Sequence, residues 1–156
     1  MAAQYDNVPQ GQAPEKPMKW HKFLIYFSFW AGALMYILNA FQMFTGSVYG
    51  EMEDFVYNIY GGLRLVDKIT ALAYVGLAIY AIAVRFALAG FKANGPRMLT
   101  QYFAAYILVN VLYNVIGGMI IGEVAWASII GSCIGTVAML LINKNYYDKR
   151  IGMFVN

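Results

Sequence analysis

Charged residues are scarce in this chain. Asp, Glu, Lys and Arg together make up 12% of its 156 residues, whereas 61% of the residues are hydrophobic and 17% are aromatic. An ordinary soluble domain carries roughly 25% charged residues, and a soluble chain of this length could not bury so much apolar surface. The composition therefore argues against a water-soluble domain and favours a membrane protein.

Histidine and cysteine are scarcer still, with one residue of each. Cys133 alone allows neither a disulfide framework nor a CxxC redox pair, and we interpret it as a small packing residue. His21 precedes the first apolar run, so no histidine is left for a nucleophilic or metal centre within a helical bundle. HExxH, paired aspartates and a phosphate-binding glycine loop are also lacking. We therefore expect no enzyme activity, no catalytic, cofactor-binding or metal-binding residues, and no cofactor.

Long apolar runs are what the chain does have. A membrane-spanning helix needs about 20 mostly apolar residues, and four segments come close to that length or exceed it. We predict four spans, at about 23–44, 67–91, 98–121 and 124–143. The third and fourth spans are separated by little more than Gly122-Glu123, so they should be antiparallel neighbours. The expected fold is an all-α, antiparallel four-helix bundle in a membrane, and residues 20–156 form this membrane domain.

The first residues are polar and rich in Gln, Pro and Gly. We interpret residues 1–19 as a disordered cytoplasmic leader. The apolar run that follows is too long for a signal peptide, and no small-residue cleavage site comes after it. We therefore expect the first span to be retained.

The basic residues predict which side of the membrane each loop occupies, because Lys and Arg are in excess on the cytoplasmic side. The amino-terminal tail, the loop after the second span and the carboxyl-terminal tail would share one side. That side holds Lys16, Lys19, Lys22, Arg85, Lys92, Arg97, Lys144, Lys149 and Arg150. The other side holds only Arg64 and Lys68. We predict that both termini are cytoplasmic. The formal net charge of +3 is distributed around the spans, so we expect no nucleic-acid partner.

Arg85 stands inside the second apolar run, before Lys92 and an Asn-Gly-Pro turn. If the hydrocarbon layer begins near Ile69, the helix has risen about 24 Å when it reaches Arg85, at about 1.5 Å per residue. The hydrocarbon core is roughly 30 Å thick, so the guanidinium can extend to the inner boundary. We favour this role at the membrane edge over that of an intramembrane ligand for a substrate.

The loop between the first two spans contains an amphipathic pattern. Met52, Phe55, Val56, Ile59 and Tyr60 recur at helical spacing. We predict a short helix on the outer membrane surface, acting as a connector. The second span would begin at Asp67, a plausible N-cap.

Small and polar residues in the last two spans are candidates for helix packing. The fourth span contains a GxxxG pattern, which lets membrane helices approach closely. The third span carries Asn110 and Asn114 on a polar stripe that also includes Tyr106 and Tyr113. Counting outward from the hairpin turn pairs Asn114 with Gly131 and Ser132, and Asn110 with Gly135 and Thr136. The alternative is that the polar stripe lines a path for an ion or small molecule.

Other residues are expected at the membrane interfaces, where aromatic and long basic side chains are common. These candidates are Trp20, Arg85, Lys92, Trp126, Tyr146 and Tyr147.

Three stretches carry a resemblance to a known group of proteins. They read "MKWHKFLIYFSFWAGAL", "RFALAGFKANGP" and "NYYDKRIGMFVN". These stretches resemble a group of small, uncharacterised four-span membrane proteins of gut Firmicutes. The resemblance implies a bacterial plasma membrane and a four-helix topology, but no substrate and no catalytic residue.

Together these patterns predict a non-enzymatic structural or interaction component of the bacterial plasma membrane. Its expected partners are the lipid bilayer and either another membrane protein or further copies of the same chain. The alternative is a subunit of a small transporter or channel.

Overall fold

The computed structural model describes residues 18–155, and these residues form helices and turns without a strand. The main elements are α1 (Lys19–Phe23), η1 (Leu24–Ser28), α2 (Phe29–Thr45), α4 (Leu63–Ala89), α5 (Gly95–Ile121) and α6 (Trp126–Asp148). The short elements are η2 (Ser47–Met52), α3 (Glu53–Ile59) and η3 (Ile151–Met153). Four helices in the described chain are long and apolar enough to cross a membrane. The predicted all-helical architecture is therefore confirmed for this part of the chain.

The first long helix is continuous but not uniform. Its segment η1 is a π-helix between α1 and α2. The helix ends at Gly46, whose φ of 81° lies in the left-handed region that glycine adopts readily. The chain then turns through η2 into α3, which has Glu53 and Asp54 in its first turn, where the helix dipole favours negative charge. The short helix predicted between the first two spans is thus present as α3, and η2 precedes it.

α4 begins at Leu63, four residues before the predicted start. Asp67 is therefore inside the helix, and the prediction that it caps the helix is wrong. A turn at residues 90–94 connects α4 to α5, and Gly95 at the start of α5 approaches the Ala87 backbone closely.

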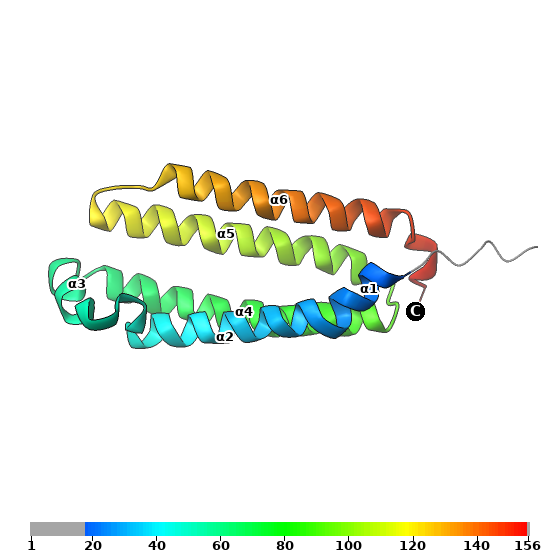
Figure 1. Cartoon of the computed structure of the whole chain (residues 1–156), viewed down its shortest axis with the longest axis horizontal. Coiled ribbons are helices and arrows are strands. Elements are labelled where there is room, and N and C mark those ends of the chain that lie inside the picture. Colours follow the sequence, from blue (N-terminus) through cyan, green and yellow to red (C-terminus); the bar gives the residue numbers. More distant parts are fainter. Residues whose placement is uncertain (1–17, 156) are drawn as a thin grey trace, which may run out of the picture.

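The connection from α5 to α6 folds back along α5. A Cβ at Gly118 would lie 2.8 Å from both the Glu123 oxygen and the Val124 Cα, so only glycine leaves room for the loop here. As a result α6 begins set back from the end of α5, unlike the second helix of a tight hairpin (Figure 1).

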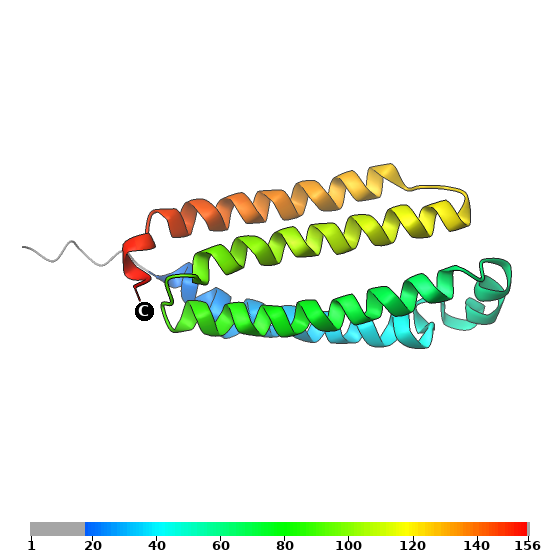
Figure 2. The same cartoon turned by 180° about the vertical axis from the view of Figure 1, so that it is seen from behind.

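The helices pack in the order in which they occur in the chain. α2 lies beside α4, α4 beside α5, and α5 beside α6, with the most extensive contact between α2 and α4 and the least between α5 and α6 (Figures 1 and 2). α1, the turn between α4 and α5, and η3 lie together at what we call the terminal end. η2, α3 and the loop between α5 and α6 lie at what we call the α3 end.

Two groups of buried side chains hold the helices together. The group nearer the terminal end includes Phe29, Val84, Leu99 and Tyr147, which join all four long helices. The second group, from Ala40 and Met43 to Tyr74 and Leu77, joins α2 to α4. α6 takes little part in either group, and most of its apolar side chains are exposed on the surface of the chain.

Candidate functional site

The contact between α5 and α6 contains one polar bond between the helices. The Ser132 hydroxyl lies 3.0 Å from its acceptor Asn110 Oδ1 on α5, and shares its single proton with the carbonyl oxygen of Ile129 in its own helix, at 2.9 Å. Asn114 and Thr136 instead donate to backbone carbonyls of their own helices, those of Asn110 and Ser132. The register predicted for the two helices is therefore wrong by about one turn, because the loop after α5 folds back over Gly118.

Gly131 and Gly135 do not make the predicted close approach to α5. A Cβ built at either glycine would find no atom of the described chain within 4 Å beyond the neighbouring turns of its own helix. The nearby residue Ile129 is buried, unlike the two glycines. This correction places the two glycines on an open side of α6, next to an apolar groove formed by Ile129, Ile130, Cys133, Ile134, Val137, Ala138 and Leu141.

At the terminal end, α1 crosses to α6 and binds it through two side-chain pairs. The Trp20 indole donates to Asn143 Oδ1 at 3.0 Å. His21 Nδ1 and the Tyr147 hydroxyl are also 3.0 Å apart, whereas His21 Nε2 has no hydrogen-bond partner in the described chain. His21, Asn143 and Tyr147 are all buried. Trp20 and Tyr147, predicted as residues of the membrane interface, thus take part in the contact between α1 and α6.

Arg85 is half-buried near the same end and contacts the first long helix. Its Nε donates to the carbonyl oxygen of Ile25, which belongs to η1, at 3.1 Å. The guanidinium carbon also lies 4.6 Å from the ring centre of Phe86 and 5.4 Å from that of Trp30. Arg85 therefore has partners within the bundle, in addition to any role at a membrane edge.

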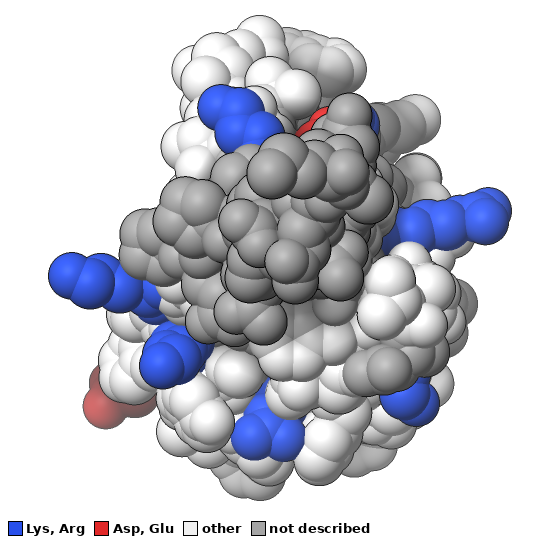
Figure 3. Space-filling view, turned by 90° about the vertical axis from the view of Figure 1, so that its right-hand side faces the viewer, with Lys and Arg blue, Asp and Glu red and all other residues white. Residues whose placement is uncertain are grey.

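The remaining candidates at the interfaces lie on the surface. Lys92 and Trp126 are exposed, at opposite ends of the bundle, and Tyr146 is half-buried beneath the guanidinium of Arg150. Basic side chains surround the terminal end, with few acidic ones among them (Figure 3). This distribution agrees with the grouping of Lys and Arg predicted for that end.

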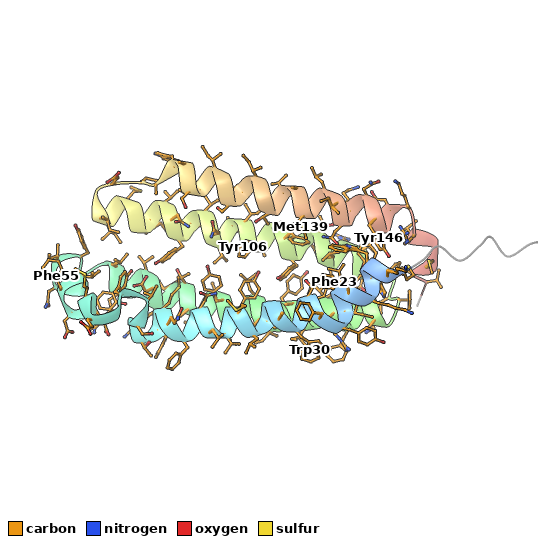
Figure 4. The ribbon with its side chains drawn as sticks, in the orientation of Figure 1. Phe23, Trp30, Phe55, Tyr106, Met139 and Tyr146 are labelled. Carbon is orange, nitrogen blue, oxygen red and sulfur yellow. The ribbon has the colours of Figure 1, made fainter. Side chains whose placement is uncertain are left out.

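Tyrosines occupy the middle of the bundle, between the α2–α4 pair and α5. The hydroxyls of Tyr36 and Tyr102 are 2.9 Å apart, and the Tyr36 ring stacks on that of Tyr74. Tyr106 lies on the side of α5 that faces these rings, 5.9 Å from Tyr36 between ring centres (Figure 4). The polar stripe predicted on α5 therefore turns at least partly toward protein.

A polar cluster that the sequence reasoning missed lies at the α3 end. Asp67 is fully buried, and its Oδ2 accepts hydrogen bonds from the hydroxyls of Tyr49 and Tyr57 at 3.0 and 2.9 Å. Tyr113 of α5 interacts with both Asp67 and Tyr49. We call Asp67, Tyr49, Tyr57 and Tyr113 the Asp67 cluster.

A signal for this cluster exists in the sequence. Asp67 shares a helical face with Leu63, Thr70, Ala71 and Tyr74, all of which are buried. This is the i, i+4, i+7 spacing of a core-facing stripe, and it places the carboxylate inside the bundle once α4 is extended back to Leu63.

No family model, curated protein or solved structure matches the chain. The resemblance to a group of Firmicutes membrane proteins therefore stays a prediction. Within residues 18–155, no three His, Cys, Asp or Glu side chains come together in a way that could hold a metal ion.

Proposed function

We propose that the chain is an antiparallel four-helix protein of the bacterial plasma membrane, with both termini in the cytoplasm. Two observations support this. The described part of the chain has four helices of sufficient length and apolarity, and most of its basic residues gather at the end where the described chain begins and ends. Positive charge in short loops is retained on the cytoplasmic side, which would place the α3 end outside.

We further propose a non-enzymatic role, in which the protein binds another membrane-embedded chain through α6. The observation that carries this proposal is the open side of α6. This helix contacts α5 but has free space at both Gly131 and Gly135. Because lipid tails are as apolar as leucine, membrane helices associate through close packing at small residues. An open GxxxG face next to an apolar groove is suited to that kind of contact.

The test compares two glycine substitutions in full-length protein expressed in bacterial membranes. Gly135→Leu fills the open face of α6, whereas Gly76→Leu is a matched control on α4, where an added Cβ also meets nothing within 4 Å. A photoreactive residue at Ile134 should cross-link to a second chain in wild-type protein, and Gly135→Leu should weaken the cross-link at least several-fold. Gly76→Leu should leave it unchanged.

Cross-linked products identify the partner as a second copy or as another protein. The proposal fails if wild-type protein gives no cross-link in membranes. It also fails if the two leucine variants weaken the cross-link equally.

The alternative function, as a subunit of a small transporter or channel, rests on the polar groups at mid-bundle. Asn110, Asn114 and Tyr106 are only half-buried in the chain by itself. Cysteines at Asn110 and Asn114, in a Cys133→Ser background, distinguish the two functions. Reaction with a small water-soluble thiol reagent at both positions would support an aqueous path, and protection at both would contradict it.

A further inference from the structure

The Arg85 guanidinium has hydrogen-bond donors that the described chain does not use. Its Nε donates to the carbonyl oxygen of Ile25 at 3.1 Å, but its two terminal nitrogens form no hydrogen bond or ion pair with a described residue. Arg85 is half-buried, so part of the guanidinium is open to the surroundings of the bundle. Charged side chains at membrane depth pair with other groups. The terminal nitrogens are therefore available to an anion from outside the chain.

An apolar groove lies beside this guanidinium, between α2 and α4. The guanidinium carbon of Arg85 is 5.4 Å from the ring centre of Trp30, which lines the groove and points away from α5 and α6 (Figure 4). The other lining residues are Ala33, Leu34, Ile37, Ala78, Ile79 and Ile82. Ala33 and Ala78 are buried, whereas the larger lining residues are half-buried or exposed. The two alanines therefore form the floor of the groove.

The groove has the size and direction expected for a lipid acyl chain. Its volume is about 370 Å³, and residues 30–37 of α2 rise about 10 Å at about 1.5 Å per residue. Ile82 precedes Arg85 by about one turn of α4, and the rest of the groove lies farther toward the α3 end (Figure 1). A lipid whose headgroup contacts Arg85 would thus extend its chain toward the middle of the bundle.

The charges at the terminal end favour a headgroup with a net negative charge. Most acidic residues of the described chain lie near the α3 end, namely Glu51, Glu53, Asp54, Asp67 and Glu123. Asp148 lies at the terminal end but pairs with Lys144 at 2.6 Å. An ammonium headgroup would therefore find no unpaired carboxylate among the described residues near Arg85. An anionic headgroup without an ammonium would instead meet the basic side chains at this end (Figure 3).

We propose that Arg85 and this groove bind one anionic phospholipid, with its phosphate on the guanidinium and one acyl chain along the groove. Guanidinium groups form strong, oriented hydrogen bonds to phosphate oxygens, and basic pockets between membrane helices bind anionic lipid headgroups. In the proposed orientation Arg85 lies near the cytoplasmic headgroups, and the groove extends toward the bilayer middle. This inference rests on the proposed membrane location of the chain and does not depend on binding through α6.

Binding is measured on full-length protein in a mild detergent, with phosphatidylglycerol that carries brominated acyl chains. Bromine quenches tryptophan fluorescence at short range, and Trp30 lines the groove. Quenching should saturate as this lipid is added, and Trp30→Phe should remove most of the saturable part. Phosphatidylcholine with the same chains should quench less at equal mole fraction. Soluble glycerol phosphate should not displace the lipid, because it has no chain to occupy the groove.

The decisive variant is Arg85→Gln, which removes the charge. It should raise the concentration of phosphatidylglycerol needed for half-maximal quenching about tenfold, the effect of losing one charge-assisted hydrogen bond. Arg97→Gln is the matched control, because Arg97 is an exposed arginine at the same end, on α5, and does not line the groove. It should change that concentration less than twofold.

A second pair of variants tests the groove if Arg85→Gln fails to fold. Leu34 lines the groove and is 60% exposed, so Leu34→Ser leaves the buried core intact and should weaken phosphatidylglycerol binding several-fold. Leu108→Ser is its control, since Leu108 is 59% exposed on α5 and does not line this groove. Leu108→Ser should leave the binding unchanged.

Several results would overturn the proposal. Equal quenching by the two lipids would mean that the groove does not select an anionic headgroup. Displacement by glycerol phosphate would indicate a site for a soluble anion, and equal effects of Arg85→Gln and Arg97→Gln would indicate surface charge alone. Recovery of the protein in the membrane fraction of cells is measured first. A protein that is found there but binds no phosphatidylglycerol would refute the lipid site and leave the membrane location standing.

Discussion

The bond between His21 and Tyr147 should contribute measurably to stability. Tyr147→Phe removes one hydroxyl and keeps the ring, which packs edge-on against His21 and Phe154. The substitution would leave both nitrogens of the buried His21 ring without partners, since Nε2 already has none in the described chain. Leaving a buried polar group unsatisfied costs about 1–3 kcal/mol. We therefore expect Tyr147→Phe to lower the free energy of unfolding by about 1–3 kcal/mol.

The assay is reversible unfolding in mixed micelles with increasing dodecyl sulfate, followed by circular dichroism. Tyr26→Phe is the control, because Tyr26 is 69% exposed and no bond of its hydroxyl to the described chain is present. This variant should stay within about 0.5 kcal/mol of wild type, as surface substitutions usually do. A double-mutant cycle with His21→Phe isolates the pair, since replacing both partners should cost less than the sum of the two single changes. Equal stability of Tyr147→Phe and Tyr26→Phe would refute the reasoning.

Three further predictions concern other contacts. Gly118→Ala should destabilise the protein by about 1–3 kcal/mol in the same unfolding assay, because the new Cβ overlaps the backbone of the following loop; unchanged stability would contradict the fold-back of that loop. Ser132→Ala should cost about 0.6 kcal/mol, the average for hydrogen bonds between membrane helices, and a loss above about 2 kcal/mol would indicate a larger role than the Asn110 bond. A cysteine at Asn94 should resist an impermeant thiol reagent in intact cells and react after lysis, and labelling in intact cells would overturn the proposed orientation.

The long helices could be predicted from the sequence because length and apolarity are local properties of a segment. The helix ends were harder to predict, as α4 shows. Asp67 resembles an N-cap, but the preceding residues from Leu63 onward also pack into the bundle and extend the helix. The burial of these residues in the bundle thus determines where α4 begins, which the residue types around Asp67 alone do not.

The α5–α6 register could not be predicted, since it depends on how the loop lies in space. Pairing residues at equal distances from Gly122-Glu123 assumes a tight hairpin. In the structure the loop packs on Gly118, and α6 begins only at Trp126. The bond between Asn110 and Ser132 is therefore one turn away from its predicted place. A GxxxG pattern also does not show which helix packs against it. The binding of another chain at Gly131 and Gly135 therefore remains a proposal.

The Asp67 cluster was missed because its members are far apart in the chain. Tyr49 and Tyr57 reach Asp67 only when η2 and α3 fold back against α4. Periodicity places the carboxylate on the inner face of α4, but it does not show which hydroxyls meet it. Such contacts become visible only when the elements are placed together.

The π-helical segment η1 determines how the side chains of α1 are oriented relative to those of α2. Each residue of an α-helix turns the chain by about 100°, and π-helical turns accommodate extra residues within the same helix. Upstream of η1, Trp20 and His21 face α6, whereas downstream Phe29 and Ala33 face the core shared with α4 and α5. One uninterrupted helix can thereby pack against α6 with its first part and against α4 and α5 with its second part. Loss of one residue between 24 and 28 would be absorbed by a change of η1 to ordinary α-helix, whereas in a uniform α-helix the same loss would rotate α1 by about 100° relative to α2.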